Sequence, residues 1–263
     1  MARVAHGRLS FERAGANTVL RDAYAESPLR VLTPRNHGQA AWAFTSTLGG
    51  GFVDGDRVRL RIRVGEGARA YVSTQGPTRI YRSPAGCEST VSAEVAAGAA
   101  LVLAPDPTAC FKGARFRQRT EVDLAEGASV AVCDVLSAGR SGERWSFDRC
   151  SLGLVVRRGG RAVLEDSWLL DSGHGPLGDR LGRFEALGTA FVAGPLFARE
   201  TLALDSQPVV PRSRLLLSSS PVGSDAVLLR LAAASVEELT LELRARLRMV
   251  PALLGDNPWA RRA

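Results

Sequence analysis

The sequence predicts an all-β protein, a helicoid or solenoid-like stack of β-strands in layered sheets, with one C-terminal helix and little other helix. Two observations favour strands: arginine alternates with aliphatic residues over residues 57–64, and a glycine-containing turn returns about every 30 residues. A third observation concerns helix. A clear helical pattern occurs in a single segment near the C-terminus, so the sequence predicts little helix elsewhere.

The alternating segment is the best-defined strand. Residues 57–64 read RVRLRIRV. Successive side chains of a strand point to opposite faces, so this pattern predicts one solvated and one buried face. Gly49–Gly51 and Asp54–Asp56 punctuate the chain before it, and Gly65–Gly67 form a turn after it.

A similar turn recurs along the middle of the chain. Its glycines are Gly67, Gly98, Gly127 and Gly160, at spacings of 31, 29 and 33 residues. Each turn lies between two strand-like runs, which together cover residues 57–64, 68–74, 90–96, 100–104, 115–124, 129–136, 145–157 and 162–170. This repeat favours stacked strand pairs, and a sandwich of unrelated hairpins at similar spacing is the alternative.

The regularity ends after Leu170. We expect a single domain over residues 1–263, with a repeat-like β core at about 50–195 and a C-terminal strand and helix within 215–250. The segments outside the repeat predict a glycine-rich loop, two strands and a Pro- and Arg-containing connection, at residues 171–180, 184–192, 226–232 and 207–214 respectively.

The predicted helix spans Ser235–Val250. Ser235 and Glu238 have the spacing of a capping box, apolar residues then recur at helical spacing, and Pro251 is expected to stop the helix. We expect this helix to pack against a sheet. Residues 253–263 form a tail that either docks on a partner or frays.

The net charge and the cysteine content limit the possible functions. The net charge is +7, and Lys112 is the single lysine, so the positive charge comes almost entirely from arginine. The arginines are spread along the chain, which favours solvated strand faces over a binding surface for nucleic acid. Four widely separated cysteines and no apparent signal peptide or membrane span predict a cytoplasmic protein with reduced thiols.

Several catalytic and binding signatures are missing from the sequence. The one lysine follows Phe111, so no P-loop is present, and the three histidines lack metalloprotease or zinc-finger spacing. No GxSxG hydrolase elbow or aromatic RNA-binding motif occurs. These observations rule out nucleotide hydrolysis by a P-loop and predict that the protein holds no metal tightly. Binding of nucleic acid would depend on charge alone, so we expect none.

A few carboxylates occupy unexpected positions. Asp134 lies inside the apolar strand VAVCDVL, on the same face as Val130 and Val132. A buried carboxylate is costly unless it is paired or hydrated, so either a salt bridge to Arg140 or a polar internal passage would explain it. Glu165 and Asp166 raise the same question in AVLEDSWLL, whereas the position of Asp56 favours a turn.

Several short sequence motifs, taken in order, resemble those of the UreD (UreH) family of urease accessory proteins. They are PLR (28–30), GGFVDGDRVRL (50–60), GARA (67–70), STQGPTRIYRS (73–83), PDPTACF (105–111), ARFRQRT (114–120), DVLSAGR (134–140) and GERWSF (142–147). The resemblance covers about residues 7–195 well, and the C-terminal helix and tail more faintly.

The resemblance implies a non-enzymatic chaperone for nickel insertion into urease, with an all-β helicoid fold. It implies binding to the urease apoprotein and to the accessory protein UreF. It also implies that the GTPase UreG joins the complex, so GTP belongs to UreG and nickel passes only transiently. The family resemblance points to an internal polar passage for the metal. By motif, that passage would involve Asp56, Thr74, Gln75, Arg79, Asp134, Arg140 and either Glu165 or Asp166.

The sequence departs from the family pattern at some of these positions. The family usually has Lys at the position of Arg79, and Glu at the positions of Asp134 and Asp166. The early segment near Ala41 also lacks the usual Cys-His pair. A conduit suits the sparse His and Cys content, because isolated carboxylates would bind nickel weakly enough to release it. The alternative function is a basic β-solenoid module that binds polyanions or carbohydrate.

Overall fold

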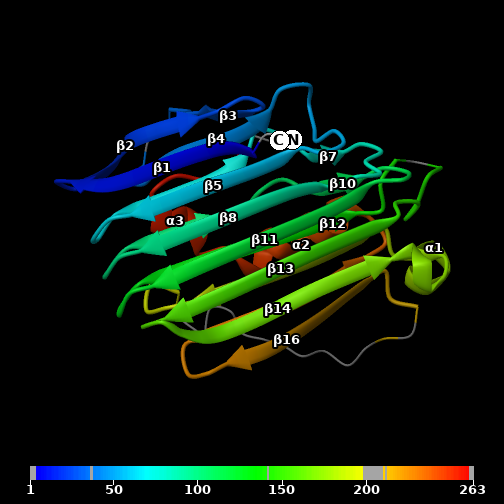
Figure 1. Ribbon diagram of the computed structural model, residues 1–263. Coiled ribbons are helices and arrows are strands. Elements are labelled where there is room, and N and C mark those ends of the chain that lie inside the picture. Colours follow the sequence, from blue (N-terminus) through cyan, green and yellow to red (C-terminus); the bar gives the residue numbers. More distant parts are fainter. Residues whose placement is uncertain (1–3, 36–37, 141, 198–209, 211, 261–263) are drawn as a thin grey trace.

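Two β-sheets stack face to face and form the body of the molecule (Figure 1). The computed structural model describes residues 4–35, 38–140, 142–197, 210 and 212–260. Sheet A contains, in spatial order, β14 (Arg161–Asp171), β13 (Arg149–Arg158), β11 (Arg115–Leu124), β8 (Cys87–Val95), β5 (Arg57–Val64), β1 (Val4–Ala14) and β2 (Asn17–Ala25). The predicted all-β, layered fold is confirmed.

Sheet B lies opposite sheet A and is longer. Its main path runs β16 (Leu215–Val222), β17 (Ala226–Ala233), β15 (Ala186–Ala193), β12 (Ser129–Ser137), β9 (Ala100–Leu103), β6 (Arg69–Thr74), β4 (Ala41–Thr47) and β3 (Leu29–Leu32). Two short strands, β7 (Thr78–Ile80) and β10 (Thr108–Cys110), branch from the end of β12.

The chain passes repeatedly from sheet A to sheet B through equivalent corners. β5 leads to β6, β8 to β9 and β11 to β12, and within each sheet these strands pair in parallel. Gly67, Gly98 and Gly127 occupy the corners with φ of 61°, 65° and 71°, a left-handed conformation that glycine adopts without a steric penalty. The three corners are the source of the 30-residue period.

The fourth turn of the predicted period is of a different kind. Gly159 and Gly160 join β13 to β14, which pair antiparallel within sheet A. They therefore form a hairpin and not a corner between sheets. The stack instead extends toward the N-terminus, where β1 pairs parallel with β5 and β4 pairs parallel with β6.

The segments after the repeat differ in part from the predictions. The glycine-rich stretch contains a 3₁₀ turn (Ser172–His174) and the short helix α1 (Leu177–Leu181) in place of a continuous loop. The strand expected from residue 145 begins at Arg149, because Trp145 has a positive φ in the turn before it. The 207–214 connection lies mostly outside the described residues.

The C-terminal helical segment consists of two helices that cover the outer face of sheet B. α2 (Val236–Arg246) begins at Ser235, whose side chain accepts a hydrogen bond from the Glu238 amide as predicted. Pro251 does not stop this helix. It lies in the first turn of α3 (Val250–Leu254), where the missing amide proton of proline is not needed. Within the described residues, no helix is long and apolar enough to cross a membrane.

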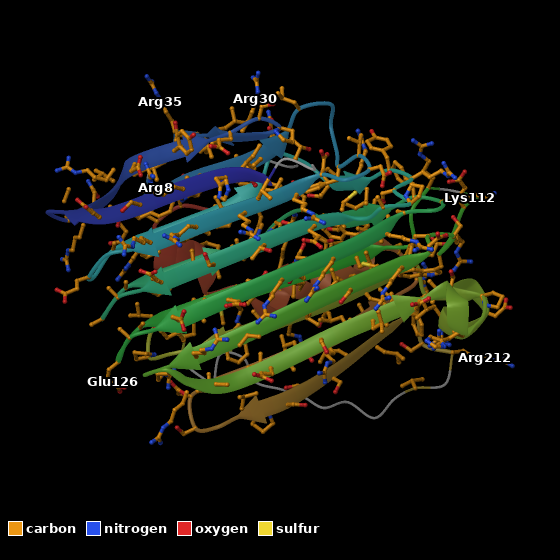
Figure 2. All side chains as sticks on the ribbon, in the orientation of Figure 1. Arg8, Arg30, Arg35, Lys112, Glu126 and Arg212 are labelled. Carbon is orange, nitrogen blue, oxygen red and sulfur yellow. The ribbon has the colours of Figure 1, made fainter. Side chains whose placement is uncertain are left out.

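The charged side chains lie mainly outside the two sheets. Arg57, Arg63 and Arg115 of sheet A form ion pairs with Glu88, Glu94 and Asp148 on the same face. Arg8, Arg30 and Arg35 lie near β1–β3, whereas Lys112 and Arg212 lie at the other end of the molecule (Figure 2). The positive charge is therefore spread over the surface, as the sequence predicted.

Candidate functional site

The interior between the sheets is apolar at one end and contains both polar and apolar side chains at the other. Near the corners, the strands of sheet A end in buried aliphatic residues such as Val64, Val95 and Leu124. At the opposite end, hydroxyl and amide side chains lie among apolar ones such as Leu60 and Phe116. They surround a cavity of about 420 Å³.

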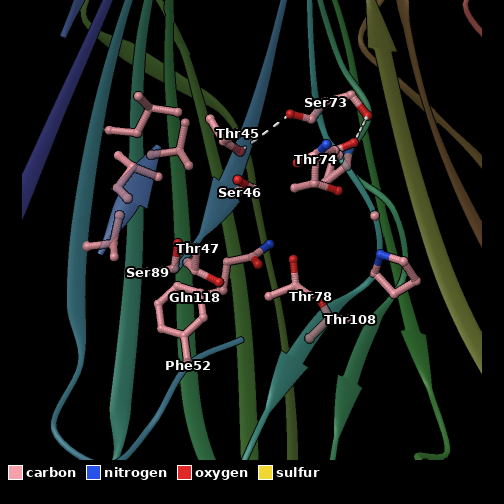
Figure 3. Close-up of a pocket in the computed structure, with 18 of the residues that line it drawn as sticks. Thr45, Ser46, Thr47, Phe52, Ser73, Thr74, Thr78, Ser89, Thr108 and Gln118 are labelled. Atoms are coloured by element: carbon pink, nitrogen blue, oxygen red, sulfur yellow. Dashed lines mark hydrogen bonds between the residues drawn. The ribbon is translucent and has the colours of Figure 1, made fainter. Parts of the chain in front are cut away.

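Both sheets contribute polar groups to this cavity. Sheet A provides Ser89, Gln118 and Thr120, and sheet B with its short strands provides Thr45, Thr47, Thr74, Thr78, Thr108 and Asp134. Many of these side chains converge on the open space in Figure 3. A polar cavity of this size has room for several water molecules. The cavity is therefore suited to hydrated polar cargo.

Asp134 is the one carboxylate among the described residues that line the cavity. It extends from β12 toward sheet A, and its Oδ1 accepts a hydrogen bond of 2.6 Å from Nε2 of Gln118 on β11. Burial raises the pKa of Asp134 to about 6, although the Gln118 hydrogen bond acts in the opposite direction. Asp134 can therefore exchange a proton close to neutral pH.

The expected salt bridge between Asp134 and Arg140 is wrong. Arg140 is exposed, and its guanidinium carbon lies 4.1 Å from the centre of the Phe111 ring. Asp134 is held by Gln118 from the opposite sheet instead. Of the two explanations for a carboxylate in this strand, the polar interior agrees with the structure.

The mouth of the cavity contains three further residues of the expected passage. Thr74 lines the wall, and its Oγ1 accepts a hydrogen bond of 2.8 Å from the Asp106 amide. Gln75 and Arg79 are exposed and lie at the rim. The structure thus brings together Thr74, Gln75, Arg79 and Asp134.

The remaining residues of the expected passage lie elsewhere. Asp56 supports a turn, where its Oδ2 accepts a hydrogen bond of 2.8 Å from the Val53 amide. Glu165 faces solvent, whereas its neighbour Asp166 faces the interior and forms an ion pair with Arg230 of β17. Asp56, Arg140, Glu165 and Asp166 are not among the residues that line the cavity.

Sequence reasoning missed most of the polar lining. Gln118 and Thr120 share a strand face with Phe116 and Val122. Two polar residues therefore interrupt an otherwise apolar face of β11. The same interruption occurs at Ser89 in β8. Strand phase would have revealed these positions, had it been followed through every strand of the repeat.

The cavity lacks the features of two other kinds of site. Glycoside hydrolysis ordinarily requires a pair of carboxyl groups across the bond to be cleaved, and the described lining has Asp134 alone. Within the part of the chain that the structure describes, no group of three or more His, Cys, Asp or Glu side chains could hold a metal. Apart from Asp134, the side-chain oxygen donors of the described lining are neutral hydroxyl and amide groups.

Residues 3–263 match a family described as UreD urease accessory protein. A urease accessory protein UreD from Sorangium cellulosum is 47% identical, over 97% of this chain and 83% of that protein. Another from Anaeromyxobacter sp. is 41% identical, over 98% and 90%. Urease accessory protein D of Oryza sativa subsp. indica is 27% identical, over 98% and 96%.

Proposed function

The chain belongs to the UreD family of urease accessory proteins, and we propose that it is a non-enzymatic chaperone that passes nickel into urease through its interior. In this proposal, it binds the urease apoprotein together with UreF and UreG. UreG uses GTP, and nickel is cargo that this chain does not retain. The proposal places this step in the cytoplasm, where the four buried, unpaired cysteines stay reduced.

The observation that carries the conduit proposal is a cavity lined by hydroxyl, amide and apolar side chains, in which Asp134 is the one carboxylate among the described lining residues. Its hydroxyl and amide oxygens are weak ligands for Ni²⁺, which prefers imidazole and thiolate. A hydrated cation can therefore be accommodated without being trapped. Asp134 supplies one negative charge between the sheets, which offsets part of the cost of bringing the cation out of bulk water.

The partners are tested by co-purification. The full-length chain, co-expressed with UreF, UreG and the urease apoprotein, is expected to be recovered in one complex in a low-imidazole buffer. A matched pair of variants asks whether the cavity mouth takes part in assembly: Arg79→Ala at the rim and Arg61→Ala on the distant outer face of sheet A. Failure of the wild-type chain to associate with any of these partners would refute the scaffold proposal.

A further inference from the structure

A row of polar positions continues from Asp134 toward the edge of sheet B. Asp134 pairs with Thr189 of β15, Thr189 with Arg230 of β17, and Arg230 with Ser218 of β16. Strand alternation places this row on the face toward sheet A, because Leu187, Phe191 and Leu228 on the same phase belong to the core between the sheets. The row therefore leads from the cavity to the margin of the sandwich.

The row reaches an ion pair that joins the two sheets. Arg230 of β17 contacts Asp166 of β14, the edge strand of sheet A. The Asp166 side chain is 8% exposed, whereas the Arg230 side chain is 46% exposed. The carboxylate thus faces the interior, and the guanidinium group lies between it and solvent.

A second, small space shares Asp134 with the cavity. It has a volume of about 10 Å³ and is lined by Asp134, Thr189 and apolar side chains that include Trp168 and Leu152. Such a volume corresponds to roughly one water molecule. Trp168 and Asp166 occupy neighbouring inward positions on β14, so this space lies close to the ion pair.

We propose that Arg230 is a latch that keeps free divalent cations from crossing the far end of the polar row. This inference rests on the proposed conduit and adds a means of regulating it. Arg230 places a positive charge at the margin, where it repels a cation, and it occupies the carboxylate that would otherwise bind one. Because the guanidinium is half exposed, an acidic group on a docked protein could draw it away and release Asp166.

Entry of Ni²⁺ into the isolated full-length chain tests the latch. Ni²⁺ quenches the fluorescence of a nearby tryptophan, and the Trp168 contribution is the difference between each protein and its Trp168→Phe counterpart. We expect Arg230→Gln to raise this quenching about threefold or more. The matched control is Arg158→Gln, which removes an ion pair to Asp225 next to the Gly159–Gly160 hairpin and is expected to leave the quenching unchanged.

Two further variants keep the test decisive. If Arg230→Gln does not fold, Arg230→Gln combined with Asp166→Asn leaves no unpaired carboxylate and is still expected to raise the quenching, because the repelling positive charge is gone. No increase in the folded variant, or an equal increase in Arg158→Gln, would overturn the latch. Asp134→Asn separates this result from the conduit. If nickel loading of urease depends on Asp134 while quenching is unaffected by Arg230, only the latch fails.

Discussion

Asp134 carries a stability cost that depends on pH. Its pKa is 3.8 before folding and about 6 in the folded chain, because burial disfavours the charged carboxylate. Below pH 4 both states are protonated and the cost is absent. Between pH 4 and 6 the unfolded state releases its proton first, so stability falls as the pH rises, by up to about 3 kcal/mol above pH 6.

We therefore expect Asp134→Asn to stabilise the protein at pH 7.5 by up to about 3 kcal/mol. The asparagine keeps an oxygen for the Gln118 hydrogen bond and carries no charge. Urea unfolding of both proteins from pH 4 to 8 measures the difference, which should vanish near pH 4. A difference that is constant across this range would show that Asp134 is not buried as described.

Gln118 is expected to set the protonation of Asp134. Replacing it with methionine removes a hydrogen bond to the charged carboxylate, which should raise the pKa of Asp134 further, by about one unit. Carbon-13 NMR of the labelled aspartates measures this pKa. Ser89→Ala changes another side chain of the cavity and should shift the pKa much less. Equal shifts in the two variants would assign the effect to general repacking.

The corners between the sheets depend on glycine for conformational reasons. Gly98 has φ of 65°, and the nearest atom to an added Cβ is the Gly67 Cα at 4.0 Å, so space is available but the conformation is unfavourable. We expect Gly98→Ala to cost about 1–2 kcal/mol of unfolding free energy. Gly76→Ala is the control, because an added Cβ there meets nothing within 4 Å. A neutral Gly98→Ala would show that the corner does not require this conformation.

Helix α2 is attached to sheet B through its buried leucines. Leu239 is fully buried beside Gly188 of β15, whereas Leu241 is 58% exposed. Leu239→Ala should cost about 2–5 kcal/mol, and Leu241→Ala should be close to neutral. Thermal or urea unfolding of the two variants compares them directly. Similar costs would mean that α2 is held differently from the packing described.

The strands of the repeat were predictable because their signals are local. Residues 57–64 and 115–124 coincide with β5 and β11, since alternation and flanking turns define both. The repeat predicts that the turn at Gly160 is equivalent to the other three, but it is a hairpin. Both kinds of turn use glycine, and only the pairing partner distinguishes them. Pro251 is ambiguous for a similar reason, because proline can end one helix or occupy the first turn of the next, as it does in α3.

In the whole molecule, the stacking of the two sheets brings residues from separate strands into contact. The Gln118–Asp134 contact joins β11 to β12 across the interior, and Asp166–Arg230 joins β14 to β17. The sequence marks Asp134 and Asp166 as unusual, but their partners depend on which strands face each other. These contacts depend on how the two sheets stack, which a local stretch of sequence does not specify.

We propose that nickel reaches urease through the interior of this chain. The most direct test measures nickel per urease active site after maturation with wild type, Asp134→Asn or Glu165→Gln, alongside recovery of the intact complex. Glu165 faces solvent and provides a carboxylate control on the outer surface. We expect intact complexes throughout, with nickel loading reduced about tenfold or more by Asp134→Asn alone. Full nickel loading by Asp134→Asn in a stable complex would contradict this proposal.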